Sequence, residues 1–314
     1  MLLRLPVFFR PLLPSVRVCL RSLSIYFMHC FSKYVATGKQ ITYTVLSATV
    51  RETNTLAILH TQEKEIIVLI RFIITVCFVI LYLILTIPVL VVLWLIGLRN
   101  PSLRERGARV MIRWAFRTIL KLDGVRITVI GQERIPKDQA VLYIGNHRSF
   151  FDILLTYTLV PGLTGYVAKK ELSKFPVFRV WMEYIHCLFL DRSSVKEGLK
   201  MILAGVDKIR NGISVFIFPE GTRSNTPDEL DMLEFHSGSL KMASKADCPI
   251  VPVALLNTRN IFEAHFPKIR KTHVVIEFGE PIVLSDLAPQ DRKNIGPYTK
   301  NCLETMLQKN KPMV

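Results

Sequence analysis

The sequence contains few cysteines and no Cys-x-x-Cys pair: its six cysteines are scattered along 314 residues. A disulfide-stabilised secreted domain or a structural zinc site needs cysteines at paired spacings. The sequence also has no other metal-ligand spacing and no internal repeat. These absences predict a chain that folds in a reducing compartment around a hydrophobic core, without a bound metal.

Charged residues are absent from residues 72–98, a run that is bracketed by Arg71 and Arg99. About 20 apolar residues are enough to cross the hydrocarbon core of a bilayer. Trp94 lies near one end of the run, which is typical of the membrane–water interface. Pro88 is expected to kink this helix or to divide it into two shorter helices. The run favours membrane attachment over the alternative, a buried helix of a soluble protein.

Positive charges exceed negative charges by 16, and many of them follow the apolar run. Residues 100–122 begin with Asn-Pro, a capping residue followed by a proline at the first helical position. This helix would lie against phosphate headgroups, or its apolar side would pack on the protein's own core, and the sequence leaves both open. Its basic residues predict the cytoplasmic face of a membrane, with membrane lipids rather than nucleic acid as partners. A helical wheel separates two sets of residues, which are Arg106, Arg109, Arg113 and Arg117 on one side and Ala108, Ile112, Ala115 and Ile119 on the other.

Acidic residues are missing from the first fifty positions, which contain six basic residues. This composition is typical of an organelle transit peptide, and an upstream extension with Met28 as a later start is the alternative. We therefore predict three parts: a basic, poorly ordered extension over 1–64, a membrane-anchoring helical segment over 65–122, and an α/β domain over 123–314.

Short apolar segments alternate with helical patterns from residue 123 onward. Alternation of this kind predicts a helix-covered α/β sheet, mostly parallel or mixed. Helices are expected to begin near Ser149, Ser194 and Ser237. Sites in such sheets lie in the loops beyond the carboxyl ends of strands. The predicted strands are Val125–Ile130, Ala140–Ile144, Gly165–Ala168, Cys187–Leu190, Ser214–Phe218, Ile250–Leu255 and His273–Phe278.

The sequence GNHRSFFD (145–152) follows one of these strand ends. His147 is a competent base near neutral pH, and Asp152 could hold one ring nitrogen so that the other can take a proton. Alternatively, Ser149 and Asp152 form a capping box and His147 only satisfies a backbone carbonyl. No Gly-x-Ser-x-Gly elbow is nearby, so a catalytic His147 would activate a hydroxyl of the substrate.

Two further strand ends carry polar residues. The sequence FPEGTRS contains Gly221, which lets the backbone approach a ligand, and Thr222, which offers a hydroxyl. It also contains Arg223, whose planar fork suits phosphate, and Glu220, which could fix that arginine or bind a substrate hydroxyl. Arg192 follows another strand, where a surface ion pair is the simpler interpretation.

Together these segments resemble the four ordered blocks of the glycerolipid acyltransferases, most closely the bacterial-type 1-acyl-glycerol-3-phosphate acyltransferases. The resemblance extends from about residue 66 to the end of the chain. One departure is His186, which stands where the family often has glycine, three residues before the second block. The blocks are Asn146-His147-x4-Asp152, Phe189-x-x-Arg192, Phe218-Pro-Glu-Gly-Thr-Arg223 and Ile250-Val-Pro-Val253.

The resemblance implies that His147 is the general base and that Asp152 orients it. It also implies that Arg192, Glu220 and Arg223 bind the glycerol phosphate, beside Gly221 and Thr222. The expected reaction transfers an acyl group from acyl-CoA or acyl carrier protein to the free hydroxyl of lysophosphatidic acid, without a cofactor. Backbone N–H groups after His147 are expected to stabilise the oxyanion.

Three alternatives remain open at this stage. One is an acyltransferase that acts on another lysophospholipid or on glycerol phosphate. Another is a hydrolase that uses the same His147 and Asp152 to activate water. The third is a catalytically silent membrane adaptor that binds anionic lipid.

Overall fold

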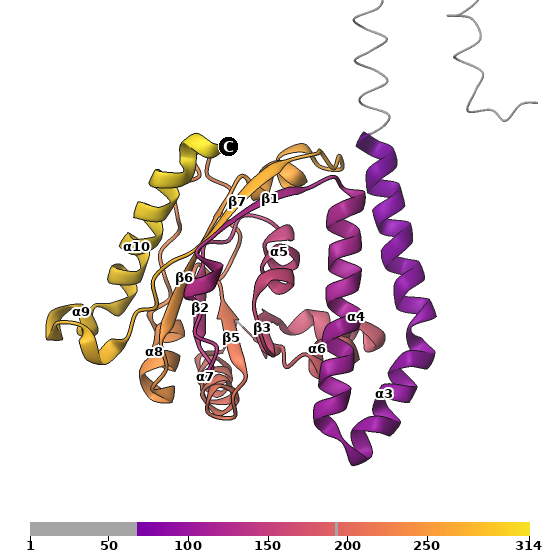
Figure 1. Ribbon diagram of the computed structural model, residues 1–314, viewed down its shortest axis with the longest axis horizontal. Coiled ribbons are helices and arrows are strands. Elements are labelled where there is room, and N and C mark those ends of the chain that lie inside the picture. The colour runs from indigo at the N-terminus through magenta and orange to yellow at the C-terminus, as the bar shows by residue number, and fades with distance from the viewer. Residues whose placement is uncertain (1–67, 192–193) are drawn as a thin grey trace, which may run out of the picture. The chain divides into compact units, whose positions relative to one another are not determined.

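The computed structural model describes residues 68–191 and 194–314 (Figure 1). The described residues belong to one compact unit, Ile66–Val314. The predicted basic extension over 1–64 lies outside the described residues, and so does Arg192. The predicted division of the remaining chain at residue 122 stays a prediction.

A seven-stranded sheet forms the centre of the described unit, in the order β1-β7-β6-β2-β5-β3-β4. Neighbouring strands are parallel except for the antiparallel pair β6–β7. This confirms the predicted mostly parallel α/β sheet, and every predicted strand is present within two residues of its expected ends. The strands are β1 (Arg126–Ile130), β2 (Leu142–Gly145), β3 (Thr164–Lys169), β4 (Leu188–Leu190), β5 (Ser214–Ile217), β6 (Ile250–Leu256) and β7 (His273–Phe278).

Helices cover both faces of the sheet, with one hydrophobic cluster on each side. One face carries α7 (Val195–Arg210), α8 (Ser237–Ala246) and α10 (Ile295–Asn310). The other carries α5 (Phe151–Leu159) and α6 (Pro176–Tyr184). The predicted helix starts near Ser149, Ser194 and Ser237 are confirmed, whereas α6, α10 and the short α9 (Pro289–Lys293) were not predicted.

The apolar run forms two helices, which is one of the two outcomes expected from Pro88, the other being a kink. The described part of the first is Val68–Leu85, and α3 (Ile87–Arg99) follows with the proline in its first turn. Val68–Leu85 has a mean hydropathy of 2.9 and is long and apolar enough to cross a membrane, and only 6% of its residues are fully buried inside the protein. Its exposed surface associates the chain with a membrane and is rich in large aliphatic residues, among them Ile73, Ile80, Leu81, Ile84 and Leu85.

Helix α4 (Pro101–Leu122) begins as expected, because the side chain of Asn100 accepts a hydrogen bond of 3.0 Å from the N–H of Leu103. Its predicted apolar residues are all buried, so this side packs on the protein's own core. Arg109 and Arg113 donate to the carbonyl of Val160 at the end of α5, where a cation complements the helix dipole. Arg106 and Arg117 remain exposed.

His186 adopts a left-handed backbone conformation, with φ at 63°. The backbone there is therefore the one that a glycine would favour, even though a side chain is present. The carbonyl oxygen of His186 lies 2.2 Å from where a Cβ on Gly165 would stand. His186 thus leads into β4 with the backbone conformation typical of glycine, and its carbonyl lies close to Gly165 of β3.

Candidate active site

The turn from β2 into α5 carries the histidine motif, and two features fix its path. Gly145 lies against Phe216 and Leu255, which a Cβ would approach to 3.0 and 3.2 Å. The side-chain amide of Asn146 donates to the carbonyl of Leu255 (2.9 Å) and accepts from its N–H (2.8 Å). Asn146 therefore pins the start of the turn to strand β6 as a backbone partner would.

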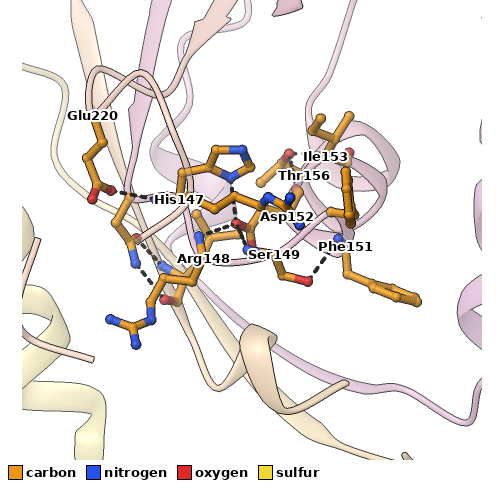
Figure 2. A network of polar contacts seen from close by, with 12 residues as sticks. His147, Arg148, Ser149, Phe151, Asp152, Ile153, Thr156 and Glu220 are labelled. Atoms are coloured by element: carbon orange, nitrogen blue, oxygen red, sulfur yellow. Dashed lines mark hydrogen bonds and ion pairs between the residues drawn. The ribbon is translucent and has the colours of Figure 1, made fainter. Parts of the chain in front are cut away.

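His147 and Asp152 are in direct contact, with Nδ1 and Oδ2 separated by 2.9 Å (Figure 2). A carboxylate can only accept here, so Nδ1 carries the proton and Nε2 is the nitrogen able to take one. The ring of His147 also stacks on Phe218, with centroids 4.2 Å apart. Two restraints thus fix the imidazole, whose side chain is 16% exposed, whereas Asp152 is fully buried.

Asp152 has a second task in the same structure. Its Oδ2 also accepts from the backbone N–H groups of Arg148 and Ser149, each at 2.7 Å. Of the predicted capping box, only the contact of Asp152 with the N–H of Ser149 is present, because the Ser149 hydroxyl accepts from the N–H of Phe151 instead. The orienting role of Asp152 is compatible with its contact to His147 and stays a prediction. The further suggestion that His147 satisfies a backbone carbonyl was wrong, since its Nδ1 contacts a carboxylate.

Glu220 is buried beneath the turn and faces backbone rather than the cavity. Its Oε1 accepts from the N–H of His147 at 2.7 Å, and its Oε2 accepts from the N–H of Leu233 at 2.9 Å. Burial raises the pKa of this carboxyl, and the two N–H groups partly oppose that rise. The neighbouring Gly221 has φ at 70°, and a Cβ there would come within 2.8 Å of the His236 ring. Both residues shape the loop after β5.

Arg223 lies beside the histidine turn. Its guanidinium carbon stands 3.6 Å from the centroid of the Phe150 ring. Its Nη1 donates to Oε1 of Glu263 at 3.0 Å. Arg223, Thr222 and His147 all line one cavity, so three of the predicted site residues share a common surface.

That cavity has a volume of about 490 Å³, which is in the usual range for ligand pockets. Most of its lining is apolar and comes from helix Val68–Leu85, α4, α5, β3 and α6. Buried residues of this lining include Ala115, Ile119 and Trp181. His147 of the polar turn therefore lines the same cavity as the apolar residues of helix Val68–Leu85, α4, α6 and strand β3.

The N–H groups at the start of α5 all have acceptors within the protein. Carboxylates take those of residues 147 to 150, and the hydroxyl of Ser149 takes the next. The prediction that these groups stabilise an oxyanion therefore does not hold for this conformation. Other residues with donor groups line the cavity, among them Thr222, Lys169 and Arg223.

Glu263 is the site residue that sequence reasoning missed. It lies in the short 3-10 turn Glu263–His265, between β6 and β7, and matches none of the motifs. Only its position in space connects it with Arg223 and Ser149. Over 68–191 and 194–314, no group of three or more His, Cys, Asp or Glu is placed to hold a metal ion.

Comparisons with known proteins agree with the resemblance found in the sequence. A family model described as Acyltransferase matches residues 126–256. The 1-acyl-sn-glycerol-3-phosphate acyltransferase of Borreliella burgdorferi is 34% identical over 154 residues, which cover 49% of this chain and 60% of that protein. The Saccharomyces cerevisiae protein of the same name is 28% identical over 207 residues, covering 64% of this chain and 67% of that protein.

One further protein and one solved structure are also similar to this chain. A Mycoplasma pneumoniae protein named "Probable 1-acyl-sn-glycerol-3-phosphate acyltransferase" is 30% identical over 189 residues, covering 56% of this chain and 69% of that protein. The crystal structure of the 1-acyl-sn-glycerophosphate (LPA) acyltransferase from Thermotoga maritima superposes with a TM-score of 0.59 at 21% identity. That match covers 76% of this chain and 98% of the other, and it shows a shared fold.

Proposed function

The chain belongs to the family of the 1-acyl-sn-glycerol-3-phosphate acyltransferases and is an acyltransferase, and we propose that it converts lysophosphatidic acid to phosphatidic acid. The donor is an acyl thioester, of coenzyme A or of acyl carrier protein. One observation carries the proposal. A histidine oriented by a buried carboxylate lines the same cavity as Arg223, and the rest of that cavity is mostly apolar.

His147 acts as the general base. Its Nδ1–H is held by Asp152, so Nε2 takes the proton from the acceptor's free hydroxyl as that oxygen attacks the thioester carbonyl. The new C–O bond gives a tetrahedral intermediate. When it collapses, the C–S bond breaks and the leaving thiolate takes the proton back from His147. Protons and electrons balance without a metal or a cofactor.

Arg223 holds the acceptor's phosphate, with Arg192 as a second ligand. The guanidinium is a planar donor that matches phosphate geometry, and Phe150 supports it from one face. Thr222 lies next to it on the cavity wall and supplies a hydroxyl. Glu220 and Gly221 hold the loop that carries Thr222 and Arg223. Glu220 does so through its hydrogen bonds to backbone N–H groups, and Gly221 through its left-handed backbone conformation.

The apolar part of the cavity accommodates the fatty acyl chain. Its lining consists mostly of aliphatic and aromatic side chains, and removing the methylene groups of an acyl chain from water into such a space is favourable. Val68–Leu85, α4 and α6 all contribute to this wall. A lipid that enters from the membrane therefore meets the apolar space and the base in one continuous site.

The membrane-associated helices lie within one leaflet on the cytoplasmic face. Helix Val68–Leu85 contacts the catalytic body repeatedly, since Phe72 stacks on Phe262, Phe78 packs near Trp114, and Tyr82 packs near Trp181. A helix held along its length against the body presents only its outer side to lipid. The exposed Arg106 and Arg117 of α4 then face anionic headgroups.

The decisive test is an acyl-transfer assay of the purified chain in detergent. A panel of lysophospholipids and glycerol phosphate is offered with acyl-CoA and with acyl carrier protein as donors. We expect product with lysophosphatidic acid, and a loss on the order of 10²–10⁴-fold in His147→Ala with unchanged thermal unfolding. Thiol release that does not depend on an acceptor would instead indicate a hydrolase.

A further inference from the structure

Glu263 makes three close contacts at the edge of the active site. Its Oε2 accepts from the hydroxyl of Ser149 at 2.6 Å. Its Oε1 accepts from the N–H of Phe150 at 2.6 Å and from Nη1 of Arg223 at 3.0 Å. One carboxylate thus joins the start of α5, which carries the catalytic turn, to the arginine assigned to the acceptor's phosphate.

The contact with Arg223 leaves most of its donors available. Glu263 engages one nitrogen of the guanidinium, and Phe150 covers one face of its plane. An in-plane hydrogen bond and a stacked ring together fix both the tilt and the rotation of the group. Arg223 therefore presents the rest of its fork in a defined direction at the cavity wall.

Glu263 lies behind Arg223 and outside the cavity. Arg223 and Phe150 line the cavity, whereas Glu263 does not, and its side chain is only 12% exposed. Three donors surround its carboxylate, so its charge is directed at protein groups. This arrangement argues against a carboxylate that competes with the phosphate for the same pocket.

The segment that carries Glu263 is itself well supported. Phe262 stacks on Phe72 of the membrane-associated helix, with ring centroids 5.6 Å apart. Ile261 is fully buried, and its carbonyl accepts from the N–H of Arg270 at 2.9 Å. Glu263 is thus placed by packing that does not depend on Arg223.

We propose that Glu263 is a positioning residue that aims Arg223 at the acceptor's phosphate. The proposal rests on the proposed function, in which Arg223 binds that phosphate. It predicts that substitution of Glu263 raises KM for the phosphate-bearing acceptor and does not change KM for the acyl donor. It also predicts that the effect of Glu263 passes through Arg223.

The test compares Glu263→Ala, Glu263→Gln and Arg223→Ala with the double variant Glu263→Ala/Arg223→Ala. Initial rates are measured with each substrate varied in turn, and with 1-acylglycerol as an acceptor that lacks the phosphate. The matched control is Glu183→Gln, which removes the same charge from an exposed pair with Arg179. Thermal unfolding of every variant in detergent reports on the fold.

We expect Glu263→Ala to raise KM for lysophosphatidic acid about tenfold, with a smaller loss of kcat and an unchanged KM for the donor. Glu263→Gln keeps a carbonyl acceptor and should lie between Glu263→Ala and the native chain. In the Arg223→Ala background the second substitution should add little. With 1-acylglycerol the two Glu263 variants should match the native rate.

Two results would overturn this inference while leaving the function intact. One is an acceptor KM that rises in Arg223→Ala but not in Glu263→Ala. The other is an equal loss on both acceptors, which would make Glu263 a structural support of α5. If Arg223→Ala itself leaves the acceptor KM unchanged, the assigned phosphate pocket is wrong and the inference falls with it.

Discussion

Asp152→Asn separates the two tasks of the buried carboxylate. In the native structure Oδ2 accepts from three N–H groups, those of the His147 ring, Arg148 and Ser149, while Oδ1 is buried without a partner. Asparagine can keep a carbonyl oxygen at the position of Oδ2 only by placing its NH₂ group at the position of Oδ1, where no acceptor is available. A buried donor without an acceptor costs about 1–3 kcal/mol. We therefore expect a stability loss of about that size.

The effect on catalysis should be much larger than the effect on stability suggests. The amide oxygen still accepts from Nδ1–H of His147, so the useful tautomer survives in this orientation. The amide, however, carries no negative charge to stabilise the imidazolium that forms when Nε2 takes the proton. We expect kcat to fall by about 10²–10⁴-fold, the range for a lost general base.

The assay is steady-state transfer to lysophosphatidic acid, with thermal unfolding measured on the same preparations. His147→Ala provides the reference, and the double variant with Asp152→Asn should be no slower than His147→Ala alone, because the two residues act as one unit. An Asp152→Asn protein that melts earlier but turns over like the native chain would refute the reasoning. Asp152 would then serve only as a helix cap.

Four further predictions follow from the same geometry. Arg223→Lys keeps the charge but loses the fork, so KM for lysophosphatidic acid should rise while KM for the donor stays constant; a rise in donor KM would reverse the assignment of the pocket. Glu220→Gln replaces one of two acceptor oxygens with a donor, which should lower the free energy of unfolding by about 1–3 kcal/mol and reduce kcat by displacing the His147 turn; an unchanged melting temperature would contradict this. Ala115→Leu narrows the cavity wall, so turnover should fall more for long-chain than for short-chain donors, and equal losses would argue against an acyl-chain cavity. Burial raises the pKa of Asp123 from 3.8 to about 6, so the folded state holds this proton more tightly than the unfolded chain and stability is lost as pH rises from about 4 to about 6; thermal unfolding of Asp123→Asn should lack this decline, and parallel pH profiles would disprove it.

The strands were predictable because a buried parallel sheet needs continuous apolar segments. Residues Leu142–Gly145 are buried throughout, as are Ile250–Leu256, and both read as uninterrupted apolar runs with polar flanks. Helix α6 contains no such continuous apolar run, since it is short and its buried Trp181 and Met182 lie among half-buried and exposed residues. Its place is decided by packing against α4 and Val68–Leu85, which no local pattern records.

In the candidate site, too, local sequence patterns indicated some residues, whereas only the fold brings the others together. His147, Asp152 and Arg223 belong to segments whose residue types and spacing already indicate chemistry. Glu220 could be named from its motif, but its partners could not, because the N–H groups of His147 and Leu233 reach it only through the fold. Glu263 is 114 residues from Ser149 in sequence and had no local signal at all.

The way in which carboxylates surround the catalytic turn determines where the oxyanion can be stabilised. Asp152, Glu220 and Glu263 come from three separate segments, and together they accept the N–H groups of residues 147 to 150. An anion that approached this end of α5 would meet negative charge instead of free donors, in contrast to an ordinary helix N-terminus. We therefore expect the developing charge to be met from the cavity wall, where Thr222 offers a hydroxyl. The loop after β5 then contacts both the phosphate and the reacting carbonyl, so an error in its position should reduce binding and chemistry together.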